Sequence, residues 1–369
     1  MTDVAIAGGG LIGLAIAWRC AQRGLTVVVA DEAPGSGASY AAAGMLAPVT
    51  EAAYGEDALL RLGRASLERF PAFAAEVQRA SGLDVGLRTA GTLVVGFDAD
   101  DMRALDALHA YQLELGLAAF RLTPSEARRR EPSLTPRLRG ALHVTGDHSV
   151  DARALHAGLL AAAEAAGVRL VRTRVDRINV DSGRATGLRL ADGSQQDAGT
   201  VVLALGAWSG SVPGAPAVPV RPVKGQILRL AGADGLLNGT VRALVRGHQV
   251  YLVPAPGGRL IIGATVEDKG FDATVTAGAV HDLLREAIDV VPGVAELELR
   301  ETLARWRPGT LDNAPLLGPS ALPGLVLATG HYRNGVLLTP VTADIIAEVV
   351  AGGTLPELAA GFRADRFSR

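Results

Sequence analysis

Two kinds of hydrophobic pattern alternate at the start of the chain. Val4–Ala7 is a short apolar run of strand length, and residues 14–23 are mainly apolar up to Trp18 and have the length of a helix. Gly24 follows, and glycine is the residue type that commonly ends helices. Leu25–Ala30 is a second apolar run, which stops at the charged residue Asp31. The pattern therefore predicts a strand–helix–strand unit.

The pattern changes in the middle of the chain. Amphipathic spacing predicts helices over residues 59–81 and 100–117, with a strand region over 87–96 between them. A further short helix is predicted between Pro124 and Pro132, because proline starts helices well and cannot continue them. This part of the chain does not repeat the strand–helix–strand order of the first segment.

The first kind of pattern returns after residue 150. Residues 151–166 predict a helix, and the turn sequences Asp181-Ser-Gly and Ala191-Asp-Gly predict hairpins. Residues 200–206 predict a buried strand that ends at Gly206, can lie beside the first strand and can face the same ligand.

The order of these patterns predicts an α/β fold, α+β overall, with two interleaved domains. A Rossmann-like nucleotide-binding domain is interrupted twice by a β-rich domain, which includes a hairpin around Pro256-Gly-Gly. The nucleotide-binding domain is assigned to residues 1–54, 151–214 and 311–369. The β-rich domain is assigned to residues 55–150 and 215–310.

The turn after the first strand reads Gly8-Gly-Gly-Leu-Ile-Gly13, which contains the spacing G-x-G-x-x-G. Because this motif follows a strand and opens a helix, it indicates a dinucleotide site. Gly8 permits the tight turn, Gly10 lets the backbone approach a pyrophosphate, and Gly13 lets the helix pack on the sheet. Asp31, or alternatively Glu32, can accept from ribose hydroxyls, which disfavours NADP. A glycine-rich turn without a ligand is the alternative.

Two other segments of small and polar residues accompany this motif. Residues 35–48 are mostly Gly, Ser and Ala and end in Met45-Leu-Ala-Pro, so their backbone can lie against a large flat group. Residues 328–340 place glycines and the polar run His-Tyr-Arg-Asn between an apolar strand and a helix that begins at Gly335 or soon after. The glycine motif alone does not separate NAD from FAD, and these segments favour FAD.

Composition and charge narrow the possible functions. The chain of 369 residues is 49% hydrophobic with a formal net charge of −2, which argues against nucleic acid and membranes as partners. Of its 36 basic residues only Lys224 and Lys269 are lysines, so an arginine needs a motif around it to count as a site residue. The single cysteine, Cys20, is expected to be buried and inert in a cytoplasmic protein. No metal site is expected, since HExxH and CxxC motifs are absent from the sequence.

Six motifs, in order along nearly the whole chain, resemble those of one family. They are GGGLIG, ASYAAAGMLAP, RPVKGQ, VYLVP with GRLIIGAT, RPGTLDNAPLLG and GHYRNGVLL. Together they resemble the glycine oxidase branch of the D-amino-acid oxidase family of FAD-dependent oxidases. The resemblance implies noncovalent FAD, a β-rich domain that binds a small amino-acid substrate, O2 as acceptor, and homo-oligomers, tetramers among them.

The resemblance also implies which residues form the site. The residues implied for FAD are Gly8, Gly10, Leu11, Ile12, Gly13, Asp31, Glu32, Ala38, Ser39, Ala43, Gly44, Met45, Val175, Gly206, His331, Tyr332, Arg333, Asn334, Gly335, Val336 and Leu337. Those implied for substrate are Arg307, Tyr251, Arg333 and Met45. Arg307 is favoured because its fork of N–H donors matches a carboxylate. Val266 is expected in the pocket wall. Arg305 can reach the opposite strand face, Lys224 has no local context that favours a catalytic base, and the sequence leaves open whether either residue reaches the site.

The implied reaction is oxidative deamination of glycine and other small amines or D-amino acids. Hydride passes from the α-carbon to flavin N5, the imine hydrolyses to a 2-oxo acid (glyoxylate) and ammonia, and O2 becomes hydrogen peroxide, with no acid or base residue required. The resemblance further implies a supply of glycine imine for thiamine thiazole synthesis. A D-amino-acid or sarcosine oxidase is the nearest alternative, and an NAD-dependent dehydrogenase or a non-catalytic flavin-binding protein is more remote.

Overall fold

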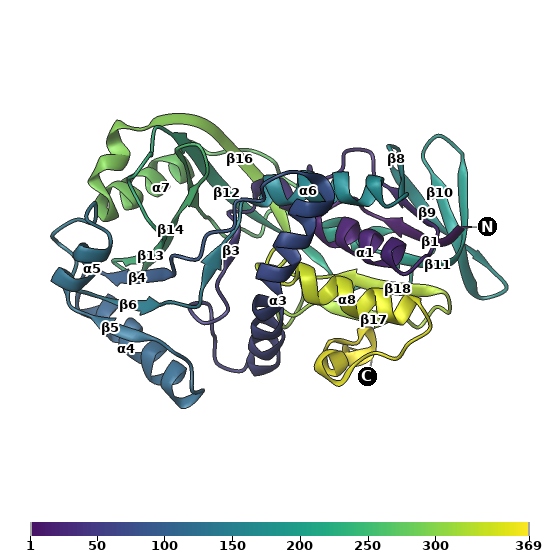
Figure 1. Cartoon of the computed structure of the whole chain (residues 1–369), viewed down its shortest axis with the longest axis horizontal. Helices are drawn as coiled ribbons and strands as arrows, with labels where there is room; N and C mark the ends of the chain where they lie inside the picture. The colour runs from purple at the N-terminus through teal and green to yellow at the C-terminus, as the bar shows by residue number, and fades with distance from the viewer. Residues whose placement is uncertain (1, 368–369) are drawn as a thin grey trace.

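The structure is a computed structural model that describes residues 2–367 of the chain. Over these residues the strands form two eight-stranded sheets and a two-stranded ladder. Figure 1 places the sheets side by side, with the chain passing between them several times. The α/β fold predicted from the sequence is confirmed, since helices cover a mainly parallel sheet that is joined to a mainly antiparallel one.

The first sheet has the order β17-β18-β11-β1-β2-β8, with β9 and β10 attached to β11. Its strands are β1 (Thr2–Ala7), β2 (Val27–Ala30), β8 (Arg169–Val171), β9 (Val175–Asp181), β10 (Arg184–Leu190), β11 (Gln195–Leu203), β17 (Leu316–Pro319) and β18 (Leu325–Thr329). β18, β11, β1, β2 and β8 run parallel. Val4 and Ile6 of β1 belong to one core cluster and Ala5 and Ala7 to another, so β1 is buried on both faces.

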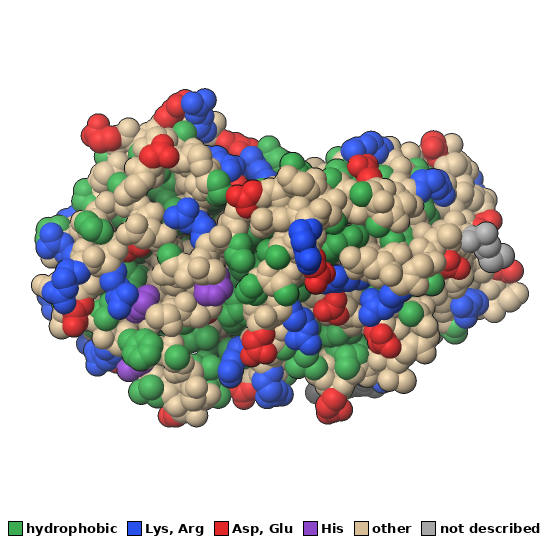
Figure 2. All heavy atoms as spheres, viewed as in Figure 1, with side chains coloured by type: hydrophobic (Ala, Val, Ile, Leu, Met, Phe, Trp, Pro, Cys, Tyr) green, Lys and Arg blue, Asp and Glu red, His purple; other side chains and the backbone are tan. Residues whose placement is uncertain are grey.

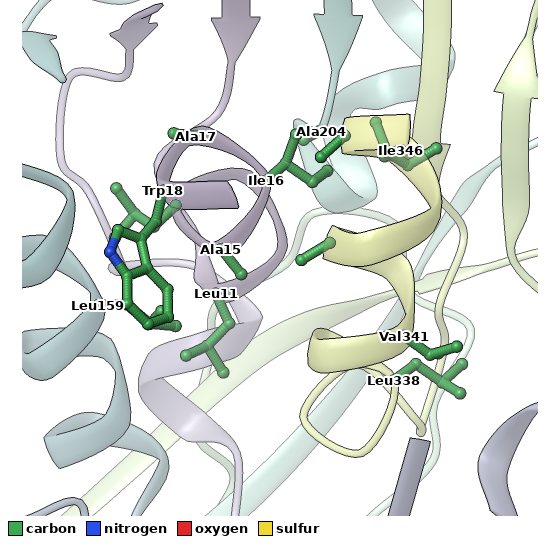
Figure 3. Close-up of a cluster of buried hydrophobic side chains, with 14 of the residues drawn as sticks. Leu11, Ala15, Ile16, Ala17, Trp18, Leu159, Ala204, Leu338, Val341 and Ile346 are labelled. Carbon is green, nitrogen blue, oxygen red and sulfur yellow. The ribbon is translucent and has the colours of Figure 1, made fainter. Parts of the chain in front are cut away.

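Helices cover one face of the first sheet. They are α1 (Leu11–Gln22), α3 (Asp57–Ser81), α6 (Ala152–Ala165) and α8 (Thr339–Val350). Figure 3 shows Trp18 of α1 on the side of Leu159 from α6, while Ile16 lies towards Ala204 and α8. α3 packs on α6 and α8, although the predicted domain boundary at residue 54 places it in the other domain.

The second sheet has the order β16-β12-β15-β14-β13-β4-β6-β5. Its strands are β4 (Thr92–Gly96), β5 (Phe120–Leu122), β6 (Gly140–Val144), β12 (Arg221–Ala231), β13 (Thr240–Val245), β14 (His248–Ala255), β15 (Arg259–Gly263) and β16 (Glu298–Gly309). Helices α4 (Ala99–Glu114), α5 (Pro124–Arg130) and α7 (Ala277–Val290) pack on this sheet. On the other face, Ile227, Val253 and Leu303 pack against residues 40–45. This contact joins the second sheet to the small-residue loop of the first segment.

The remaining elements are short. They are α2 (Ala38–Ala41), the ladder of β3 (Met45–Leu46) with β7 (His148–Ser149), and the 3-10 turns η1 (Gly206–Ser211), η2 (Pro292–Glu296), η3 (Glu357–Phe362) and η4 (Ala364–Phe367). On the face drawn in Figure 2, basic and acidic side chains are interspersed rather than gathered by sign. Within residues 2–367, none of the helices combines the length and the apolar character that crossing a bilayer needs.

Several predicted elements differ from the structure at their ends. The region 87–96 is a strand only from Thr92, because Arg88 instead bridges to Ser149. The helix expected from Gly335 or soon after it begins as α8 at Thr339. Residues 335–338 form a turn before it, which ends in a helix-type hydrogen bond from the N–H of Leu338 to the carbonyl of Asn334, at 2.8 Å. Both hairpins predicted at residues 181–183 and 191–193 are confirmed, as is the β14–β15 hairpin.

Candidate functional site

A cavity of about 590 Å³ lies where the two sheets meet. Gly8, Asp31, Ala204 and Thr329 line it at the carboxyl ends of β1, β2, β11 and β18. The carboxyl ends of parallel strands form the edge at which open α/β sheets bind ligands. Strands β12, β14 and β16 of the second sheet supply the opposite wall, and the volume is in the usual range for ligand sites.

The structure gives a steric reason for glycine at each of the three motif positions in the turn between β1 and α1. Gly8 has a φ of +111°, and a Cβ there would overlap the carbonyl oxygen of Ala204. A Cβ on Gly13 would overlap the carbonyl oxygen of Gly8. Gly10 has an ordinary φ of −76°, and a Cβ there would meet only Ser39 Oγ, at 3.3 Å. The missing side chain of Gly10 therefore leaves open space in the cavity, at the positive end of the α1 dipole.

Two acidic residues end β2 at the cavity wall. Asp31 accepts from the N–H of Gly9 through Oδ2 at 2.7 Å and from the N–H of Ala33 through Oδ1 at 2.8 Å. These bonds tie the end of β2 to the glycine turn, while each carboxylate oxygen keeps a further lone pair. Glu32 lines the cavity beside Asp31.

The loop over residues 35–45 lines the cavity and is held from behind by two arginines. Arg153 Nε donates to the carbonyl of Tyr40 at 2.9 Å, and Arg229 Nη2 donates to the same oxygen at 3.2 Å. Burial lowers the pKa of Arg229 to about 10, which still leaves it charged at neutral pH. Gly44, at a φ of +88°, has no room for a Cβ against the backbone of Val150. The loop is therefore fixed in place.

The junction before α8 meets the end of β16. The N–H of Tyr332 donates to the carbonyl of Pro308 at 3.0 Å, with Tyr332 at a φ of +44°. His331 is buried with Nε2 at 3.0 Å from Thr342 Oγ1, and burial lowers the pKa of His331 to about 3, so the ring is neutral. The hydrogen bond between Tyr332 and Pro308 brings Tyr332, Arg333 and Gly335 to the same cavity as Arg307.

The side chains of Arg307 on β16 and Tyr251 on β14 line the cavity, and each lies directly against a glycine of a neighbouring strand. A Cβ on Gly225 would overlap the guanidinium of Arg307, and one on Gly263 would overlap the hydroxyl of Tyr251. Arg307 Nη1 also donates to the carbonyl of Thr265 at 3.1 Å. Burial raises the pKa of Tyr251, and the nearby Arg307 acts in the opposite direction. The hydroxyl is therefore a proton donor at neutral pH, next to a cation.

We expect Gly225→Ala to lower kcat/KM about tenfold, the scale of one charged hydrogen bond. The added methyl group displaces the Arg307 guanidinium, whereas the cofactor end of the cavity is unaffected. Steady-state kinetics together with the visible spectrum measure both effects. Gly278→Ala on α7, where a Cβ meets nothing, is the control. Unchanged kinetics in Gly225→Ala would show that the position of Arg307 does not matter.

The family comparison matches this geometry. The sequence pattern of the family described as FAD dependent oxidoreductase matches residues 3–349. The chain is a member of the FAD-dependent oxidoreductase family. It is similar to a glycine oxidase of Geobacillus kaustophilus, with 38% identity over 94% of this chain and 92% of the relative. A crystal structure of glycine oxidase from that organism matches with a TM-score of 0.92 and 36% identity, over 99% of this chain and 98% of the other.

Another relative is longer than this chain. It is a "Bifunctional protein ThiO/ThiG" of Trichormus variabilis, 33% identical over 100% of this chain and 55% of the relative. The chain therefore spans about half of that protein, whereas it spans nearly all of the glycine oxidase.

As a member of this family, the chain has FAD as its cofactor, and the residues present fit it. The open space at Gly10 is a cradle that a Cβ would fill, and it lies at a helix N-terminus, where a pyrophosphate binds well. The small-residue loop 35–45 leads from there to Tyr251 and Arg307, so one continuous cavity joins the glycine turn to these two side chains. Within the described residues, no group of three or more His, Cys, Asp or Glu is arranged to hold a metal ion.

The cavity brings together most of the residues implied for the site. Lining it are Gly8, Gly10, Leu11, Ile12, Asp31, Glu32, Ala38, Ser39, Ala43, Gly44, Met45, Val175, Gly206, Tyr251, Arg307, His331, Tyr332, Arg333, Gly335 and Val336. Gly13, Asn334 and Leu337 lie outside its lining. Gly13 instead packs α1 against the turn, and the carbonyl of Leu337 accepts from Ser66 Oγ at 2.6 Å.

The expectation for Val266 is wrong, and the structure places Arg305 and Lys224, which the sequence left open. Val266 is 63% exposed and lies outside the lining, because β15 ends at Gly263 and the chain continues along β12 only through the backbone bonds of Thr265 and Glu267, between which Val266 is exposed to solvent. Arg305 lines the cavity with Arg307, because residues two apart on a strand face the same side. Lys224 is buried in an ion pair with Asp272 at 2.7 Å, outside the lining.

Other residues that line the cavity are not marked as site residues by any motif in the sequence. Glu51 lines the cavity and lies 3.4 Å from Arg242, which is paired directly opposite Tyr251 in the β13–β14 ladder. Trp208 and Trp306 form an edge-to-face pair at the cavity wall, with ring centroids 5.6 Å apart. Only the pairing of distant segments places these residues together.

Proposed function

We propose that this FAD-dependent oxidoreductase oxidises glycine, and more slowly other small amines and D-amino acids. The products are a 2-oxo acid (glyoxylate from glycine), ammonia and hydrogen peroxide, formed with one O2 and one water for each amine. The observation that carries the proposal is the pair of Arg307 and Tyr251 at the end of the FAD cavity, beside the junction before α8. Similarity to glycine oxidases over nearly the whole chain supports it.

Arg307 holds the substrate carboxylate in this proposal. Its planar fork can donate two parallel hydrogen bonds, and the bond to the carbonyl of Thr265 fixes one of its nitrogens in place. Tyr251 adds a neutral hydroxyl donor, since its raised pKa keeps it protonated. With the carboxylate held on these groups, the α-carbon is directed towards the loop that carries Met45.

FAD, held at the glycine turn and the loop 35–45, would supply the two-electron acceptor for the α-hydrogen, taken as hydride, and O2 would be the final acceptor. The chain contributes orientation and exclusion of water. Ile227 and Met45 place bulky side chains beside Tyr251, and this bulk restricts the room for a substrate side chain. We therefore assign glycine as the first substrate, with sarcosine and D-alanine as the ones that test the size of the pocket.

We also propose that this reaction supplies glycine imine for thiazole formation in thiamine synthesis. The support is the similarity to the ThiO/ThiG protein, whose name joins a part like this chain to a second part. The imine hydrolyses in water, so the next enzyme has to take it up close to the site where it forms.

We predict that FAD is released intact when the protein is precipitated with acid, because the single cysteine of the chain is buried away from the cavity and cannot bind it covalently. Cys20 lies in the core on α1, and burial raises the pKa of its thiol to about 12. Native protein at pH 8 should therefore also resist iodoacetamide. Absorbance of the supernatant and mass spectrometry of the pellet measure both. Yellow colour retained in the pellet would contradict the prediction.

A substrate panel tests the proposed function. Oxygen uptake and peroxide formation are measured with glycine, sarcosine, D-alanine and L-alanine at equal concentration, and ammonia is measured in parallel. The proposal expects glycine to give the highest kcat/KM and L-alanine no turnover. A faster reaction with sarcosine or D-alanine would instead indicate a sarcosine oxidase or a D-amino-acid oxidase. No peroxide from any of these amines would contradict the proposal.

A further inference from the structure

The turn over residues 48–51 is buried but belongs to no regular element, so side chains have to bind its backbone. Asp147, which is fully buried, accepts the N–H of Val49 through Oδ1 at 3.2 Å and the N–H of Thr50 through Oδ2 at 2.7 Å. Val49 and Thr50 are 8% and 5% exposed. The carboxylate thus takes the place of a strand partner for two buried donors.

The two carbonyl groups of the same residues are bound from other elements. Gln112 Nε2 on α4 donates to the carbonyl of Val49 at 2.9 Å. Arg242 Nη1 on β13 donates to the carbonyl of Thr50 at 2.9 Å. Asp147, Gln112 and Arg242 therefore surround the turn, and all three come from the second sheet or the elements packed on it. Because these side chains bind both the N–H and the carbonyl groups of the turn, they hold its backbone in a single conformation.

This frame determines where Glu51 lies. Glu51 directly follows the framed residues, its N–H donates to the carbonyl of Ala47 at 3.1 Å, and its side chain lines the cavity. Its carboxylate lies 3.4 Å from Arg242, whose strand neighbour is Tyr251. The carboxylate is therefore at the Tyr251 end of the cavity.

We propose that Asp147 is a positioning residue, which holds the turn 48–51 so that the Glu51 carboxylate accepts a hydrogen bond from the amino group of the substrate. This inference rests on the proposed function, because it assumes an amino-acid substrate held by Arg307. An amino acid carries a carboxylate and an amino group two bonds apart, and the cavity offers a cation and a carboxylate to match them. The other lining carboxylates, Asp31, Glu32 and Asp176, follow β2 or belong to β9, at the other end of the cavity.

The charge of Asp147 gives the proposal a pH signature. Burial raises the pKa of Asp147 to about 6, while the hydrogen bonds from Thr50 and Val49 and the charge of Arg242 act in the opposite direction. The other titratable neighbours are Glu51 on the turn and the adjacent His148, whose pKa is lowered by burial. Above pH 6 both carboxylate oxygens accept. Below it one oxygen carries a proton and stops accepting from its N–H group, so the turn shifts and KM for glycine changes across pH 6, while the raised pKa means that acid does not open the buried turn.

Asp147→Asn tests the inference, because the amide keeps the shape but can accept through only one atom. At pH 8 we expect KM for glycine to rise about tenfold with a smaller change in kcat. The change in KM that we expect of wild type across pH 6 should be absent in the variant, because the amide does not titrate. Hydrogen exchange of the peptide that covers residues 47–51 should become faster, with the flavin spectrum unchanged.

Glu131→Gln is the matched control. Glu131 is also buried, accepts from the N–H groups of Asn238 and Gly239 at 2.9 Å and 2.7 Å, and has a pKa raised by burial, but it lies outside the cavity lining. We expect this variant to change neither KM for glycine, nor its pH profile, nor exchange at residues 47–51.

Glu51→Gln keeps the frame and removes the proposed acceptor charge. It should raise KM as Asp147→Asn does, with exchange at residues 47–51 unchanged, and it decides the role of Glu51 even if Asp147→Asn fails to fold. Wild-type KM in both variants, or slow exchange in Asp147→Asn, would overturn the inference. If wild-type protein oxidises no amine, the proposed function fails instead, and the exchange experiment alone still decides whether Asp147 holds the turn.

Discussion

Replacing Arg307 by alanine should lower kcat/KM for glycine by about 100- to 1000-fold, mainly through KM, while FAD stays bound. Loss of one partner from a buried, hydrogen-bonded charge pair costs roughly 3–4 kcal/mol, and each 1.4 kcal/mol is a factor of ten. Arg307 is the guanidinium that the second sheet directs into the cavity over Gly225, next to Tyr251. Steady-state kinetics and flavin absorbance measure the two effects separately.

Two further variants sharpen this prediction. Arg307→Lys keeps the charge but lacks the fork of donors, so we expect only partial recovery of KM. Arg300→Ala removes an exposed arginine from the same strand, where it pairs with Glu298 at 2.9 Å, and it should leave the kinetics unchanged. An Arg307→Ala protein with wild-type KM for glycine would show that the carboxylate binds elsewhere.

Replacing Gly10 by alanine should weaken FAD binding about 100-fold and leave the apoprotein folded. The added Cβ points into the open space of the cradle and keeps the pyrophosphate away from the N-terminus of α1. Charge-assisted hydrogen bonds of the kind lost there contribute roughly 1.5–3 kcal/mol each. Titration of apoprotein with FAD, followed by flavin fluorescence, measures the dissociation constant.

The stability of the Gly10→Ala apoprotein separates this effect from misfolding. Because Gly10 has a φ of −76° and its only close neighbour is Ser39 Oγ, urea unfolding of the apoprotein should match wild type. Gly13→Ala is the contrasting variant, since its Cβ overlaps the carbonyl of Gly8 and should destabilise the apoprotein itself. Wild-type FAD affinity in Gly10→Ala would place the pyrophosphate away from this turn.

The nucleotide end of the cavity was predictable from the sequence because its determinants are local. Gly8, Gly10 and Gly13 sit at fixed spacing between a strand and a helix, and each has the steric role that the motif implies. The two hairpins of the first sheet were predictable for the same reason, since turn residues fix them within a few positions.

The substrate end was predictable only in part. Arg307 and Tyr251 came from motif resemblance, but Glu51 and Asp147 meet through the pairing of β3 with β7, about a hundred residues apart in the chain, and Gln112 reaches them from α4. No local pattern marks such a frame, because its members are single polar residues on different elements. The prediction for Val266 failed for a related reason: strand alternation holds only to the end of a strand, and β15 ends three residues before it.

The most direct test of the account is the visible spectrum of the purified protein under nitrogen, before and after addition of glycine. The account predicts flavin bands that bleach with glycine and return when air is admitted, with peroxide formed in equal amount to the flavin reoxidised. Flavin bands that persist with glycine but bleach with sarcosine or D-alanine would contradict glycine as the substrate. Bands that no amine bleaches would contradict amine oxidation by this site.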